Sequence, residues 1–103
     1  MNEDLPANLD GILMANSLHY IKEKNSFIKK NKDKLKPGGS FLIVEYDTEK
    51  SNPWVPFPVS FLLLKELFSK EGYNMITKLK ERPSIYRREN LYSALIRKGN
   101  LNN

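Results

Sequence analysis

The sequence predicts an α/β fold with the order strand, helix, strand, helix, strand, strand, in which the last strand is antiparallel. Two short apolar runs, at 12–15 and 41–44, have the length of buried strands. One helical segment separates them, which is typical of a parallel crossover. A second amphipathic helix begins near Ser60. The two alternating segments after it, 73–79 and 91–98, are too close together for a helical crossover, so they should pair antiparallel.

The first strand lies between two turn signals. Residues 12–15 are all apolar, with Asp10 and Gly11 before them and Asn16 and Ser17 after them. A continuous apolar run bounded in this way is typical of a strand in a parallel sheet. We therefore expect this strand to be buried on both faces.

The first helix is expected to start at a cap formed by Asn25 or Ser26. Its inward side chains are expected to be Phe27, Ile28 and Leu35. Pro37 cannot continue a helix, and the two glycines after it allow the positive backbone angles at which helices end. The helix should therefore stop at this Pro-Gly-Gly turn.

The second strand is predicted at 40–47, because its apolar run is too continuous for a half-exposed strand. The loop at 48–59 contains three prolines, which prevent regular structure. Ser60 is expected to cap the second helix and Gly72 to end it. The apolar face of that helix should consist of Phe61, Leu63, Leu64, Leu67 and Phe68.

Length and composition limit the classes of protein to which the chain can belong. Its 103 residues, 40% hydrophobic and 28% charged, are enough for one domain with a small core. The absence of cysteine and the single histidine argue against disulfides, thiolate chemistry and a metal site such as zinc. No apolar run is long enough to span a membrane, and the acidic start does not resemble a secretory signal. We therefore expect a soluble, cytoplasmic protein.

The net charge of +5 comes from one segment. Residues 22–36 contain seven lysines and two acids, with a single aromatic residue and no arginine. Base recognition and base stacking need arginines or interleaved aromatic residues. A solvated helix face is therefore the better interpretation, and nucleic acid is an unlikely partner.

Several stretches occur together in a characteristic order. The sequence LDGILMANSLHYI is followed by LKPGGSFLIVEYD, NPWVPFPVSF, KEGY and RPSIYRRENLYSALIRK. This combination resembles the C-terminal half of a class I S-adenosylmethionine-dependent methyltransferase, from about Asp10 to Lys98. The resemblance implies a partial Rossmann-like sheet made of the family's fourth to seventh strands, with the seventh inserted antiparallel. The whole chain, 1–103, would then be one domain corresponding to that half.

The resemblance also implies that part of the cofactor site is missing. Members of the family hold the cofactor with an acidic, glycine-rich loop of the type D/E-x-G-x-G and with an acid after their second strand. Asp10 and Gly11 precede the first strand here and have no second glycine at the required offset. Glycine is needed because only its backbone can approach a ligand closely enough. We therefore expect a truncated methyltransferase-like protein that is inactive alone and binds S-adenosylmethionine weakly or not at all.

By resemblance, Ala15, Asn16 and Ser17 would bind the cofactor. Ligands of open α/β sheets lie at the C-terminal ends of parallel strands, which points independently to this loop and to residues 45–47. Asn16 could offer an oxygen to the cofactor's ammonium group, or it could only cap the turn. His19 is the candidate catalytic base, and the alternative is a packed structural residue.

Tyr46, Trp54 and Phe57 are the candidate substrate-binding residues for a small-molecule acceptor, since aromatic side chains with a few polar tips are common in such pockets. The alternative is that these aromatic residues only hold the proline-rich loop on the core. Arg87 and Arg88 are expected to be surface charges, with anion binding as the alternative.

The resemblance has a consequence for assembly, because the family's fourth strand pairs with its first. The strand at 12–15 would here be an unprotected apolar edge. We expect a second copy to cover it, giving a homodimer, or a separate chain that carries the missing half. The alternative function is a non-catalytic interaction or dimerisation module that pairs through this exposed first strand.

Overall fold

The structure is a computed structural model that describes residues 8–83 and 90–98. Four strands form one sheet in the order β1, β2, β4, β3. Their bounds are Leu9–Ala15 for β1, Leu35–Tyr46 for β2, Met75–Pro83 for β3 and Asn90–Arg97 for β4. β1 and β2 are parallel, and β4 is antiparallel to both β2 and β3. The predicted α/β fold with a reversed strand near one edge is confirmed.

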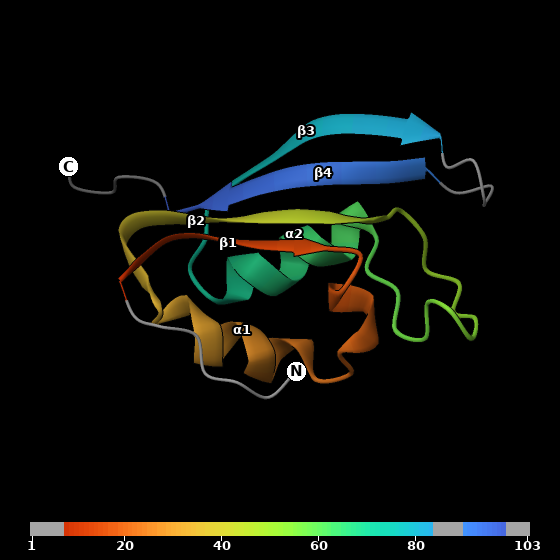
Figure 1. Cartoon of the computed structure of the whole chain (residues 1–103), viewed down its shortest axis with the longest axis horizontal. Coiled ribbons are helices and arrows are strands. Elements are labelled where there is room, and N and C mark those ends of the chain that lie inside the picture. Colours follow the sequence, from red (N-terminus) through yellow and green to blue (C-terminus); the bar gives the residue numbers. More distant parts are fainter. Residues whose placement is uncertain (1–7, 84–89, 99–103) are drawn as a thin grey trace.

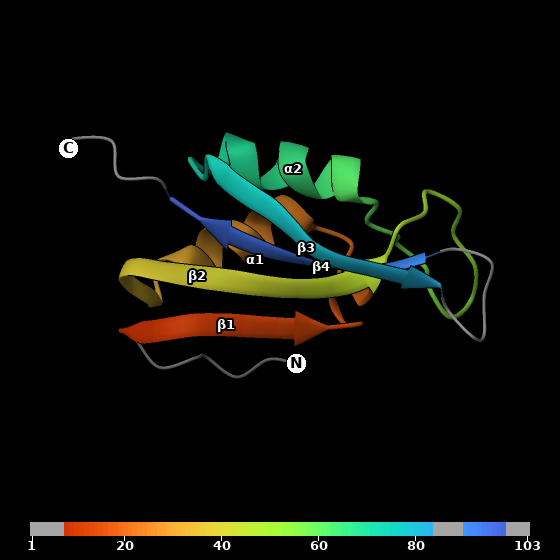
Figure 2. The ribbon, with the colours of Figure 1, turned by 90° about the horizontal axis from the view of Figure 1, so that it is seen from above.

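Both α-helices lie on the same face of this sheet. After β1 the chain forms a short 3-10 helix, η1 (Leu18–Tyr20), and then α1 (Lys24–Lys32), while α2 (Phe61–Lys70) follows β2. Figure 1 shows α1 and α2 below the sheet, and Figure 2, turned by 90°, shows α1 behind the strands and no helix in front of them. In the described part of the chain, no helix covers the other face, and none is long and apolar enough to cross a membrane.

The core lies between the sheet and the two helices. Alternate residues of β1, β2 and β4, such as Ile12, Phe41 and Ile96, point to this side and are buried, whereas β3 contributes only half-buried side chains such as Ile76. The ring of Phe41 lies 5.0 Å from that of Phe68 in α2 and 5.8 Å from that of Tyr73, measured between centroids. These contacts form an aromatic cluster that joins the middle of the sheet to α2.

The start of α1 differs from the prediction. The helix begins at Lys24, and its N-cap residue, Glu23, makes no side-chain cap hydrogen bond. Asn25 and Ser26 are helical residues and not caps. The amine of Lys24 instead donates to the carbonyl of Ile21 at 2.8 Å, which ties the first turn to the preceding loop.

The end of α1 also differs, because the sheet begins earlier than predicted. The N–H of Leu9 donates to the carbonyl of Lys34 at 2.8 Å, and Leu35 pairs with Leu9 as the first residue of β2. Leu35 therefore packs against the core from a strand and not from the helix. The Pro-Gly-Gly turn lies inside β2, where Gly38 has a φ of 84° and a Cβ on Gly39 would approach two carbonyl oxygens to 3.0 and 3.1 Å.

β1 is buried on one face only, so the prediction of burial on both faces was wrong. Ile12 and Met14 are buried against the helices, whereas Leu13 is 65% exposed. β2 follows the same alternation, with Phe41 and Ile43 buried and the residues after each of them half-buried. The reason is that both helices pack on the same face of the sheet.

α2 agrees with the prediction. The hydroxyl of Ser60 accepts a hydrogen bond from the N–H of Leu63 at 3.1 Å, as expected of a cap. Gly72 follows the helix with a φ of 92°, which favours glycine. Leu64, Leu67 and Phe68 are buried, and Phe61 and Leu63 are packed at the edge of the core.

Candidate functional site

The candidate site lies where β1 and β2 end. Asn16 follows β1 with a left-handed backbone, at a φ of 56°, and its N–H donates to the carbonyl of Val44 at 2.8 Å. Ala15 and Asn16 are exposed, and Ser17 is half-buried. The three residues expected to bind the cofactor therefore lie together and are accessible at the C-terminal end of β1.

A buried pair of side chains joins this loop to β2. The side chain of His19 is 3% exposed and that of Glu45 is fully buried. Nδ1 of His19 lies 2.6 Å from Oε1 of Glu45, and the backbone N–H of His19 donates to Oε2 at 3.0 Å. One carboxylate therefore binds both the ring and the backbone of His19, which fixes η1 against the end of β2.

This geometry limits what His19 can do. When Nδ1 donates a proton to the carboxylate, Nε2 is left as the acceptor nitrogen, and the orientation of the ring is fixed. A carboxylate behind a histidine also stabilises the protonated ring, as a general base requires. The ring is deeply buried, and the same contacts also hold the loop in place, so the geometry is compatible with both roles of His19.

Lys24 forms a second connection between the loops. Its amine donates to the carbonyl of Phe57 at 2.7 Å, and the N–H of Phe57 donates to the carbonyl of His19 at 3.0 Å. Burial lowers the pKa of Lys24, and the attraction of the Glu45 carboxylate opposes that change. The sequence predicted that this lysine lies on a solvated helix face, and its burial shows that this prediction was wrong for Lys24. Loop carbonyls and an acid satisfy its charge.

The end of β2 is held by the start of α2. Oδ1 of Asp47 accepts a hydrogen bond from the N–H of Phe61 at 3.0 Å. The centroid of the Tyr46 ring lies 6.2 Å from that of the His19 ring, and the centroid of the Tyr20 ring lies 4.4 Å from it. Tyr46 is therefore close to the buried pair.

The loop at 48–59 is held on the core by small apolar residues. Val55 and Val59 are 2% and 0% exposed, whereas Trp54 is 68% exposed and Phe57 36%. Most of the Trp54 side chain therefore lies in water, and the two valines are the buried side chains of this loop. Arg87 and Arg88 lie outside the described residues.

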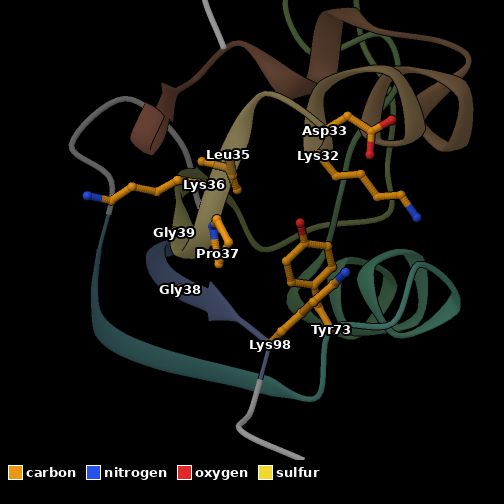
Figure 3. Close-up of a pocket in the computed structure, with 9 residues that line it drawn as sticks. All are labelled: Lys32, Asp33, Leu35, Lys36, Pro37, Gly38, Gly39, Tyr73 and Lys98. Carbon is orange, nitrogen blue, oxygen red and sulfur yellow. The ribbon is translucent and has the colours of Figure 1, made fainter. Parts of the chain in front are cut away.

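A hollow of about 670 Å³ lies at the opposite end of β2, away from the candidate site. Figure 3 shows its lining, which includes three lysines and the ring of Tyr73. The amine of Lys32 pairs with Glu71 at 3.1 Å, and Lys36 pairs with Asp10. Two of the three lysines therefore have acidic partners, and the amine of the third, Lys98, lies 5.4 Å from the centroid of the Tyr73 ring. A hollow of about 510 Å³ borders Asp47, near the candidate site at the C-terminal end of β2.

The sequence analysis missed the contacts of Glu45 and Lys24. An acid that follows a buried apolar run needs a partner if it is buried itself, and this signal could have suggested a basic or hydrogen-bonding neighbour for Glu45. Its partner lies 26 residues earlier in the chain, so no local pattern identifies it. Lys24 resembles the other lysines of its segment, and no sequence signal separates it from them.

The fold is similar to solved structures of S-adenosylmethionine-dependent methyltransferases. The 1,6-didemethyltoxoflavin-N1-methyltransferase of Burkholderia thailandensis, solved with 1,6-didemethyltoxoflavin and S-adenosylhomocysteine bound, matches with a TM-score of 0.70 at 18% identity. The match covers 96% of this chain and 48% of that enzyme. A methyltransferase of Aquifex aeolicus matches with a TM-score of 0.62 at 19% identity, over 89% of this chain and 48% of that one. One of Leishmania major matches with a TM-score of 0.67 at 20% identity, over 91% and 41%.

No model of a protein family matches the sequence, and neither does any curated protein. The chain spans about half the length of the enzymes named above. At these identities the similarity concerns the fold, and it agrees with the four-stranded sheet and its reversed strand. The chain has the fold of one part of a class I S-adenosylmethionine-dependent methyltransferase.

Proposed function

We propose that this chain, as a single domain, supplies the C-terminal half of an S-adenosylmethionine-dependent methyltransferase. The observation that carries this proposal is the match of nearly the whole chain to about half of several such enzymes. The methyl acceptor is a small molecule, and Tyr46, Trp54 and Phe57 border it. Ala15, Asn16 and Ser17 touch the cofactor, and His19 is the candidate base.

The arrangement of the loops supports this assignment of roles. The buried pair of His19 and Glu45 and the amine of Lys24 hold the loop after β1 against the loop after β2. Methyl transfer asks the protein mainly to align the nucleophile, the methyl carbon and the sulfonium, and to exclude water. Rigid loops at the ends of parallel strands suit that task.

We also propose that the chain alone is inactive, since its sequence contains no acidic, glycine-rich cofactor loop. With only part of the pocket, we expect a dissociation constant for S-adenosylhomocysteine of about 1 mM or weaker, which corresponds to at most ~4 kcal/mol of binding free energy. Isothermal titration measures this directly. A micromolar dissociation constant for the purified chain would contradict the proposed weak binding.

NMR titration tests where the cofactor binds even when the affinity is this low. With millimolar S-adenosylhomocysteine, we expect the amide signals of residues 15–17 to shift, and those of Gly38 and Gly39 at the other end of β2 to stay in place. Asn16→Gly keeps the left-handed backbone that Asn16 adopts and removes the side-chain amide, so it should reduce the shifts. Shifts confined to Gly38 and Gly39, with none at residues 15–17, would refute the cofactor assignment.

A second candidate function is a non-catalytic module that pairs through β1, either as a homodimer or with a second chain. Within residues 8–83 and 90–98, β1 pairs with β2 alone, and Leu13 on it is 65% exposed. Long apolar edge strands favour pairing with another chain. Analytical ultracentrifugation should then show association that Leu13→Lys removes and Leu62→Lys, at an exposed leucine of α2, does not. A monomer at high micromolar concentration would exclude self-pairing.

A further inference from the structure

The sheet face opposite the helices is called the open face here, and its side chains change from apolar near β1 and β2 to positively charged near β3. Because strand residues alternate, the neighbours of the buried residues point to this open face. The pairing aligns two rows of side chains across it. One row contains Leu13, Leu42, Leu95 and Thr77, and the next contains Ala15, Val44, Ser93 and Lys80.

The β1 and β2 side of this face is apolar. We call Leu13, Leu42, Val44 and Leu95 the open apolar patch. Leu13 is 65% exposed, and the other three are half-buried although no helix of the described chain lies over them. Side chains directly opposite one another on adjacent strands are in contact, so the four form one continuous surface. Contiguous apolar patches of this kind mark interaction sites.

The β4 and β3 side of the same face is positively charged. We call Lys80, Arg82 and Arg97 the cationic rim. All three are exposed. Lys80 pairs with Ser93 and Arg82 with Leu91, while Arg97 pairs with Ser40 on one side and Met75 on the other. These positions alternate with the buried ones, so the three cations lie on the open face. The paired strand positions on this face, from Gly11 in β1 to Arg82 in β3, include no aspartate or glutamate.

We infer that the open face binds an amphipathic α-helix of a partner protein, with apolar residues over the open apolar patch and acids toward the cationic rim. The same sheet already packs α1 and α2 on its other side, so a helix matches its shape. A second copy placed face to face would bring three more cations and no acid at the paired positions. The inference holds whether or not the chain takes part in methyl transfer.

A designed peptide of about 18 residues, which spans ~27 Å as a helix, tests this inference with the full 103-residue chain. The peptide carries leucines at helical spacing and glutamates along one flank. Fluorescence anisotropy should give micromolar binding. Replacing the glutamates by lysines should weaken binding about tenfold or more, since three exposed charge pairs are lost and become repulsive.

Variants of the chain test the same contacts from the other side. The triple substitution Lys80→Glu, Arg82→Glu and Arg97→Glu should weaken the acidic peptide about tenfold and restore binding of the lysine peptide. The matched control, Lys22→Glu, Lys29→Glu and Lys70→Glu, makes the same change in net charge on exposed helix-side residues and should have an effect of less than about twofold. Leu13→Ser should weaken binding, and Leu62→Ser should not.

Four results would overturn the inference. The first is equal binding of the acidic and basic peptides, and the second is failure of the lysine peptide to bind the charge-reversed chain. The third is that the chain does not bind the acidic peptide but does bind a DNA duplex, or vesicles of equal parts phosphatidylcholine and phosphatidylglycerol, and that the triple substitution abolishes this binding. The fourth is self-association through Leu13 that the peptide does not displace. Circular dichroism of each variant confirms that it is folded.

Discussion

Phe41 and Leu42 are neighbours in β2, yet Phe41 is fully buried against the rings of Phe68 and Tyr73, while Leu42 lies half-buried on a face without a helix. The same contrast separates Ile12 from Leu13 in β1. The covered face contains the aromatic cluster and the buried His19–Glu45 pair. The open face contains leucines and three cations, and the described strands place no acid at its paired positions.

This difference indicates that the two faces have different tasks. The covered face supplies the buried apolar area on which the stability of an isolated domain depends. The open face keeps apolar side chains that the domain buries only in part, so they contribute less to its stability and remain accessible to a partner. Substitutions on the two faces should therefore differ sharply in their effect on unfolding.

The largest effect is expected for Phe41→Ala, which should lower the free energy of unfolding by about 3–5 kcal/mol, since it removes a fully buried ring and leaves a cavity. Urea unfolding followed by circular dichroism measures the change. Leu42→Ala, one position away on the open face, should cost less than half as much. Equal losses at the two positions would mean that the open face is covered in solution.

Glu45→Ala should lower the free energy of unfolding by about 2–3 kcal/mol, because it leaves the ring and the backbone N–H of His19 buried without their acceptor. Glu66→Ala, at an exposed position of α2, is the control and should change the free energy by less than ~0.5 kcal/mol. If the two variants were equally stable, the carboxylate would not hold the loop.

Tyr92→Phe should cost about 1 kcal/mol at neutral pH, since the hydroxyl donates to the carbonyl of Val59 at 2.7 Å on the covered face. Burial raises the pKa of Tyr92, with smaller contributions from Glu45 and Asp47. The unfolded chain loses this proton above a pH of about 10 while the folded chain retains it, so stability falls as the pH rises further. The variant should lose less stability between neutral and alkaline pH than the unsubstituted chain does.

Burial also raises the pKa of Tyr73, so the alkaline decline should be reduced in Tyr92→Phe and not abolished. Thermal unfolding in a series of alkaline buffers compares the two proteins. An identical pH dependence would show that the hydroxyl of Tyr92 is not buried.

The smallest effect is expected for Leu13→Ser, which should change the free energy of unfolding by less than ~0.5 kcal/mol, since most of this side chain is already in water. Ile12→Ser, at the buried position next to it, is the comparison and should be strongly destabilising. A large loss for Leu13→Ser would indicate that self-association, and not the isolated domain, is being measured. Repeating the experiment at several concentrations separates the two cases.

The order of the elements, the reversed strand, and the cap and end of α2 followed from local patterns. Apolar runs, prolines, glycines and a serine before an amphipathic stretch are signals within a few neighbouring residues. The bounds of α1 did not follow, because Leu35 joins the sheet through its pairing with Leu9, which is distant in sequence. The burial of β1 on only one face could not be predicted from the sequence either, because residues 12–15 are apolar on both faces of the strand.

For the candidate site, the sequence by itself placed residues 15–17, His19 and residues 45–47 close together, because the C-terminal ends of adjacent parallel strands lie side by side. Only the tertiary structure decided that Glu45 binds His19, that Lys24 is buried between two loops, and that Leu13 faces outward beside Leu42. The physical reason is that strand and helix patterns depend on near neighbours. The partner of a buried charge, or of an apolar side chain on one face of a sheet, depends on which distant segments pack there.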